Sequence, residues 1–168
     1  MTAARRPFDP PLPLAVRLLG RARPLVAPRD MPWAHRRLIL SVVRAAIGKL
    51  DAEHKAGLLT AADRRYLAAL KRFRFGGGRS GAWRGTFIFG LADARASQEA
   101  EYWAGGLIHD GVHAWLQSRG RPFWDEVGPC EAQIDYLTRV GARSEHIASV
   151  VRFRDSRALQ RRRLGERA

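Results

Sequence analysis

The sequence contains a single cysteine, Cys130, among its 168 residues. One cysteine excludes an internal disulfide framework and is typical of a reducing compartment, so we expect a cytoplasmic protein. The sequence also lacks an uninterrupted apolar run long enough to span a membrane. The most apolar stretch near its start, residues 12–19, is interrupted by Pro13 and Arg17, so we expect no cleaved secretory signal.

Acidic residues are few compared with basic ones. The chain has 16 Asp and Glu against 30 Lys and Arg, which gives a formal net charge of +14. Such a charge attracts anionic partners without specificity, whether nucleic acid, anionic lipid or acidic protein. The arginines are spread along the whole sequence and mark no single face. The charge alone therefore predicts a non-specific anionic partner and no defined nucleic-acid site.

The distribution of proline suggests where the domain begins. Seven of the nine prolines lie in residues 1–32, together with several arginines, which predicts an extended N-terminal arm. Residues 33–155 are expected to form a single domain, which suits a chain of this length. Residues 156–168 are rich in arginine and are expected to be a frayed basic tail.

Apolar residues recur mostly at helical spacing. Helices are predicted to begin at five positions: Trp33, Thr60, Ser97, Gly128 and Ser144. The helix from Thr60 is expected to extend far enough to bury Phe73. A β-branched and aromatic run at 86–91 predicts a strand, and Arg74 with Phe75 could supply its partner. We therefore predict an α+β domain, predominantly α, in which a small edge sheet packs on a helical core.

Two histidines on the predicted helix that begins at Ser97 are the strongest chemical signal. His109 and His113 are four residues apart, so both imidazoles project from one helix face and can reach one metal ion. A catalytic zinc site usually needs a third protein ligand and an open position. Glu131 and Asp135 are also four apart, on the next helix. A carboxylate there can complete the site, and its neighbour can orient a ligand histidine.

This order of a strand, a His-x-x-x-His helix, a turn and a helix with Glu-x-x-x-Asp resembles the gluzincin metallopeptidases, whose first helix reads His-Glu-x-x-His. The resemblance covers residues 86–142. It implies a zinc-dependent hydrolase that acts on a peptide or protein substrate, with the strand at 86–91 as the edge along which the peptide pairs. It also implies roles for four residues: Zn²⁺ ligands at His109, His113 and Glu131, and an orienting carboxylate at Asp135.

One departure from that family concerns Asp110, which stands where the family has its catalytic glutamate. Aspartate offers the same acid–base chemistry with one methylene less reach, and a displacement near 1 Å can cost about 100-fold in rate. The resemblance makes Asp110 the general base if the chain is active. Gly111, which follows it, lowers helix propensity by about 1 kcal/mol relative to alanine. His146, on the last predicted helix, is a candidate for stabilising the transition state.

Two other functions use the same residues. The dipeptide His109-Asp110 also resembles the central motif of HD-domain phosphohydrolases, which are all-helical and hydrolyse phosphate esters. That site needs an earlier histidine, here His54, and a late aspartate, here Asp155. The upstream spacing and the predicted strand count against this alternative, whereas the positive charge favours it. The second alternative is a catalytically degenerate zincin or a basic interaction module, in which the helices only bind a partner.

Overall fold

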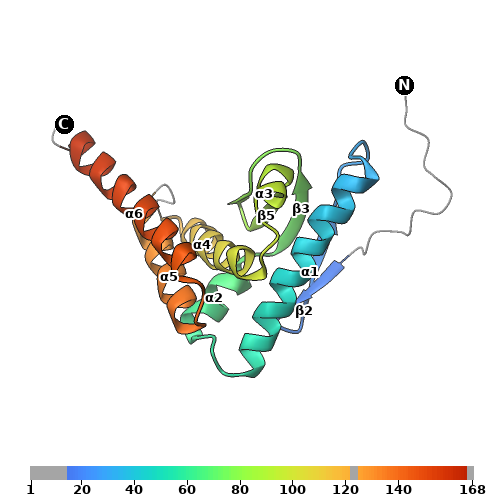
Figure 1. The fold of residues 1–168 in the computed structure, drawn as a ribbon, viewed down its shortest axis with the longest axis horizontal. Helices are drawn as coiled ribbons and strands as arrows, with labels where there is room; N and C mark the ends of the chain where they lie inside the picture. The colour runs from blue at the N-terminus through green and yellow to red at the C-terminus, as the bar shows by residue number, and fades with distance from the viewer. Residues whose placement is uncertain (1–14, 122–124, 166–168) are drawn as a thin grey trace.

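The computed structural model describes residues 15–121 and 125–165, and the predicted fold class, α+β and predominantly α, is confirmed (Figure 1). The described helices are α1 (Trp33–Lys55), α2 (Ala61–Ala69), α3 (Leu91–Ala96), α4 (Ala100–Ser118), α5 (Val127–Arg139) and α6 (Ser144–Gly165). The described strands are β1 (Ala15–Leu18), β2 (Arg21–Val26), β3 (Arg72–Gly76), β4 (Gly81–Trp83) and β5 (Thr86–Gly90). None of these helices is both long and apolar enough to cross a membrane.

The strands form one mixed sheet in the order β1-β2-β3-β5-β4. The pairs β2–β3 and β3–β5 are parallel, and the two outer pairs are antiparallel. Side chains alternate across the sheet: Phe73 and Phe75 are fully buried, whereas Arg72 and Arg74 are exposed. The predicted strand at 86–91 exists as β5, but it lies between β3 and β4. The expectation that it is an edge strand was therefore wrong.

Residues 15–32 belong to the domain, which corrects the predicted boundary at residue 33. β1 and β2 form an antiparallel hairpin, and Leu25 and Val26 join it to β3. Pro24 is unusual within a strand, because proline donates no ladder hydrogen bond. It precedes the two residues that pair with β3, so only the β1 side of β2 must accommodate it. Residues 1–14 of the predicted arm lie outside the described residues.

Two other boundaries differ from the predictions. Thr60 and Asp63 form the expected capping box, but α2 ends at Ala69, so Phe73 lies in β3 and not on a helix. At the other end of the chain, α6 continues to Gly165, so most of the predicted frayed tail is helical. Because α2 ends before β3 begins, Phe73 and Phe75 reach the core from a strand and not from the helix.

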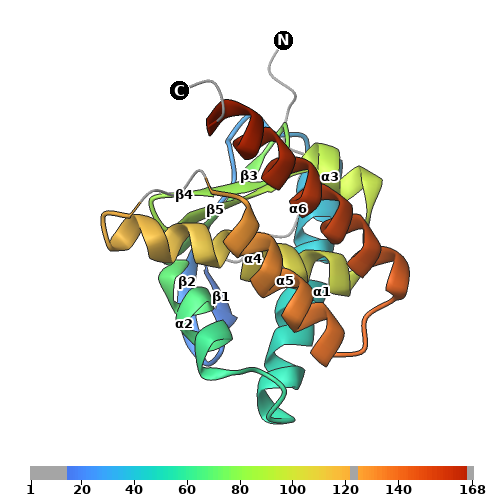
Figure 2. The same cartoon turned by 90° about the vertical axis from the view of Figure 1, so that its left-hand side faces the viewer.

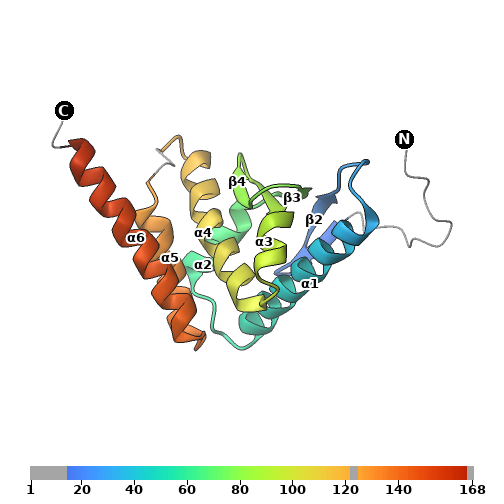
Figure 3. The same ribbon diagram turned by 45° about the horizontal axis from the view of Figure 1, so that its top comes forward.

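Helix α4 occupies the middle of the molecule and contacts α1, α2, α5 and β4. Figure 3 shows α4 with α5 and α6 on one side and α1 on the other, and Figure 2 views the molecule from the side of α5 and α6. Two of its glycines permit these close approaches. A Cβ atom at Gly111 would lie 2.9 Å from the carbonyl carbon and oxygen of Tyr66 in α2. At Gly105 it would lie 3.1 Å from a methyl group of Leu137 in α5.

Candidate metal centre

Three side chains converge where α4 meets the start of α5. His109 Nε2 lies 3.1 Å from Glu126 Oε2, and His113 Nε2 lies 3.3 Å from the same oxygen. The two imidazole nitrogens are themselves 3.3 Å apart. Within the part of the chain that the structure describes, this is the only group of three or more His, Cys, Asp or Glu side chains able to hold one metal ion.

The spacing of these three atoms fits a metal ion of the size of zinc. Zinc binds imidazole nitrogen and carboxylate oxygen at about 2.0 Å, and the corners of a tetrahedron with that bond length are about 3.3 Å apart. All three distances lie within 0.2 Å of this edge. The three atoms are therefore placed so that they could bind one such ion together.

The backbone explains why these side chains meet. His109 and His113 lie one helical turn apart on α4, on the side that faces α5. Glu126 immediately precedes Val127, the first residue of α5, where the helix dipole favours a carboxylate. Its side chain is 29% exposed, against 15% for His109 and 9% for His113. The cluster is therefore most open to solvent at the carboxylate.

The two histidines also determine the charge of Glu126. The hydrogen bond with the imidazole of His109 has the largest effect on the pKa of the Glu126 carboxyl group, and the hydrogen bond with His113 has the next largest. Together these bonds lower the pKa of Glu126 well below its usual range, although partial burial opposes them. The carboxyl group is therefore ionised at neutral pH, which is the form that binds a metal.

Glu126 occupies the position predicted for Glu131, and the prediction of Glu131 as third ligand was wrong. Glu131 and Asp135 are exposed on α5, and neither belongs to the cluster. The reason is the face that α5 turns toward α4. Buried Cys130 lies on that face, and Glu126 lies one helical turn before it. The spacing Glu-x-x-x-Cys was the available signal, since a carboxylate one turn before a buried residue shares its face.

Asp110 lies beside the histidine pair but is turned toward the sheet. Its Oδ1 accepts a hydrogen bond of 3.0 Å from the backbone N–H of Ala82 in β4. Burial raises the pKa of Asp110, and the nearby histidines, His109 first, oppose that rise. Asp110 is thus close enough to both histidines for their charges to influence it, while one of its oxygens is engaged by β4.

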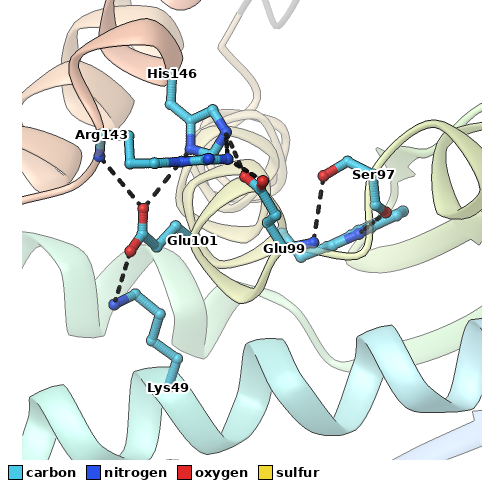
Figure 4. Close-up of polar contacts among 7 residues, drawn as sticks. Lys49, Ser97, Glu99, Glu101, Arg143 and His146 are labelled. Atoms are coloured by element: carbon cyan, nitrogen blue, oxygen red, sulfur yellow. Dashed lines mark hydrogen bonds and ion pairs between the residues drawn. The ribbon is translucent and has the colours of Figure 1, made fainter.

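The other candidate residues lie away from the cluster. His146 Nε2 is 2.6 Å from a carboxylate oxygen of Glu99, in an ion-pair group at the start of α4 that includes Glu101 and Arg143 (Figure 4). Glu101 precedes His109 by about 12 Å along the helix, at 1.5 Å per residue. His146 is therefore not placed to stabilise a transition state at the metal centre. Instead, its ion pairs with Glu99 and Glu101 connect α6 to the start of α4.

The arrangement required for an HD-type site is also missing from the described residues. His54 is exposed near the end of α1, and Asp155 is exposed on α6, where it pairs with Arg154. Neither residue joins the histidine pair in the group of potential metal ligands. The mixed sheet further distinguishes the fold from an all-helical phosphohydrolase.

Comparison with known proteins adds no relative. No family model, no curated protein and no solved structure matches the chain. The resemblance to gluzincins therefore stays a prediction from the short motif around His109 and His113, and the geometry of the cluster carries the functional argument.

Proposed function

We propose that this protein is a metal-dependent hydrolase that holds one divalent cation, best Zn²⁺, with His109, His113 and Glu126. The observation that supports this is the mutual spacing of 3.1 to 3.3 Å among the three ligand atoms. Two imidazoles and one carboxylate form a donor set that zinc favours, and it occurs in catalytic sites that keep a fourth position open. A purely structural zinc site uses four protein ligands.

Hydrolysis also needs a group that accepts a proton from the attacking water. A bound zinc ion would supply Lewis acidity and make that water easier to deprotonate. Asp110 is the proton acceptor that we propose, because it directly follows His109 on α4 and its carboxylate lies close enough to both histidines to interact with their charges. Its hydrogen bond with Ala82 uses one carboxylate oxygen, and the other can hold the proton. By resemblance, the bond hydrolysed is a peptide bond.

One observation favours a metal-binding protein without turnover as the second candidate. Asp110 is one methylene shorter than the glutamate of the family it resembles, and β4 engages it. One variant distinguishes the two candidate functions. Asp110→Asn should bind zinc normally in both, but it should abolish the cleavage of an unstructured protein such as casein only if Asp110 is the base. If zinc-loaded wild-type protein cleaves neither casein nor synthetic peptides, the second candidate, metal binding without turnover, is supported.

The metal site itself is tested by a matched pair of variants. Wild-type protein reconstituted with Zn²⁺ should retain about one equivalent after gel filtration, as measured by plasma emission. Glu126→Gln should weaken zinc binding by more than the roughly 100-fold that loss of an outer hydrogen-bond partner costs. Glu131→Gln is the control and should bind like wild type, because Glu131 is exposed on α5. Wild-type protein without bound zinc, or a reversed order of the two variants, would refute the proposed site.

A further inference from the structure

Strand β4 forms one edge of the sheet and lies against the helix that carries the two histidines. β4 pairs with β5 on one side, and its other side faces α4. In an antiparallel pair, backbone N–H groups point alternately toward and away from the partner strand. Ala82 lies within β4, and its N–H points away from β5 and toward α4. This is a group that an added strand would use. Arg84 lies in the turn between β4 and β5 and has a positive φ of 47°.

The N–H groups of Ala82 and Arg84 already have acceptors on α4. Oδ1 of Asp110 accepts from the Ala82 N–H at 3.0 Å, and Oε1 of Gln117 accepts from the Arg84 N–H at 2.7 Å. Asp110 and Gln117 are seven residues apart, which places them on one helix face two turns apart. Helix α4 therefore accepts one hydrogen bond from β4 and one from the turn that follows it, so the closure does not depend on a single contact.

We propose that α4 closes this edge of the sheet, with Asp110 and Gln117 as positioning residues, and that a substrate does not bind by strand addition to β4. The statement about substrate rests on the proposed function, whereas the closure does not. An incoming peptide carbonyl would have to replace a carboxylate acceptor at Ala82, and hydrogen bonds to charged acceptors are about twice as strong as neutral ones. A peptide substrate is therefore not held by main-chain pairing with β4.

Amide hydrogen exchange followed by NMR tests the closure directly. In Asp110→Ala, protection of the Ala82 amide should fall about 10- to 100-fold, because that is the equilibrium effect of losing a hydrogen bond to a charged group. Asp110→Asn keeps an acceptor oxygen and should preserve the protection within about threefold. In Gln117→Ala, protection of the Arg84 amide should fall about three- to tenfold. Gln117→Glu should restore it.

The amide of Phe87 in β5 is the internal control, and its protection should be equal in all variants. If Asp110→Ala does not fold, Gln117→Ala and Gln117→Glu still decide the question at Arg84. The closure would be overturned if the Ala82 amide kept its wild-type protection in folded Asp110→Ala. It would also be overturned if the Arg84 amide kept its wild-type protection in Gln117→Ala.

The substrate statement is tested with zinc-loaded protein and two probes that share one metal-binding group, acetohydroxamate and a tripeptidyl hydroxamate. We expect the tripeptidyl compound to bind without added protection at Ala82 and Arg84. A gain of protection at both amides, with loss of the Asp110 contact, would show strand addition and overturn the proposal. If neither hydroxamate binds, the proposed metal function fails, and the exchange measurements still decide the closure on their own.

Discussion

The substitution Gly111→Ala should destabilise the protein even though alanine is the better helix former. Gly111 lies between His109 and His113, where α2 crosses α4. A Cβ atom there would lie 2.9 Å from two backbone atoms of Tyr66 and 3.1 Å from its Cβ. Backbone atoms cannot rotate away as a long side chain can. Either α2 must therefore shift or the α4 backbone must deform beside the candidate metal centre.

Two opposing effects determine the size of the change. Alanine gains about 1 kcal/mol of helix propensity over glycine. Overpacking in a close-packed interior costs about 1–3 kcal/mol, and a contact with backbone favours the upper part of that range. The free energy of unfolding should therefore fall by about 1–2 kcal/mol. Gly106, in the same helix, has no atom within 4 Å of its hypothetical Cβ, so Gly106→Ala should gain about 1 kcal/mol.

Urea unfolding of the two variants beside wild type measures this difference. The transition midpoints should move in opposite directions at an unchanged m-value, which shows that stability and not the extent of unfolding has changed. For a chain of this size each kcal/mol corresponds to about 2–4 °C in Tm. If Gly111→Ala proves as stable as Gly106→Ala, α2 does not need the space that glycine leaves, and the described crossing is wrong.

Three further predictions concern titration, a buried hydrogen bond and metal removal. Burial raises the pKa of the Cys130 thiol to about 12, so aromatic disulfide reagents should label it at pH 8 only after unfolding. The pKa of an unfolded thiol is about 8.5, so above this pH the unfolded state is stabilised by losing a proton that the folded state keeps. The free energy of unfolding should therefore fall as pH rises above about 8.5. Equal stability at pH 8 and pH 10 would contradict this. Tyr136→Phe removes a 2.5 Å hydrogen bond to buried Glu53 and should cost about 1.5–3 kcal/mol in urea unfolding, whereas Tyr102→Phe, at an exposed position, should cost almost nothing. Excess zinc at 100 times its Kd should add about 2.7 kcal/mol of stability, and a chelator should remove that gain in wild type but have no effect in Glu126→Gln.

Local periodicity was sufficient to predict several elements and two of the three residues of the candidate site. The apolar stripe from Trp33 gave α1, and the capping box at Thr60 gave the start of α2. The shared face of His109 and His113 follows from helical spacing alone, and the structure places their imidazoles together. Each of these depends on residues only a few positions apart, for which helix geometry fixes the relation.

The parts that could not be predicted depend on how separate elements pack. Sequence spacing puts Glu126 and Glu131 on different faces of one helix, but the choice between them depends on which face α5 turns to α4. Likewise, nothing in the local sequence of residues 86–91 shows that β4 will pair with the edge of β5 that faces away from β3. The contact between Asp110 and Ala82 joins residues that the sequence separates by a strand and a helix. Such contacts exist only once the sheet and α4 have assembled.

The parallel pairing of β2 with β3 has a consequence for synthesis of the chain. Leu25 pairs with Phe73, and α1 and α2 lie between them in sequence. The N-terminal hairpin therefore leaves the ribosome well before its partner strand exists, and a lone two-stranded hairpin is only marginally stable in water. During that interval β2 carries Arg21, Arg23 and Pro24, features that discourage pairing with another nascent chain. We therefore expect these residues to limit association of β2 with other chains until β3 emerges.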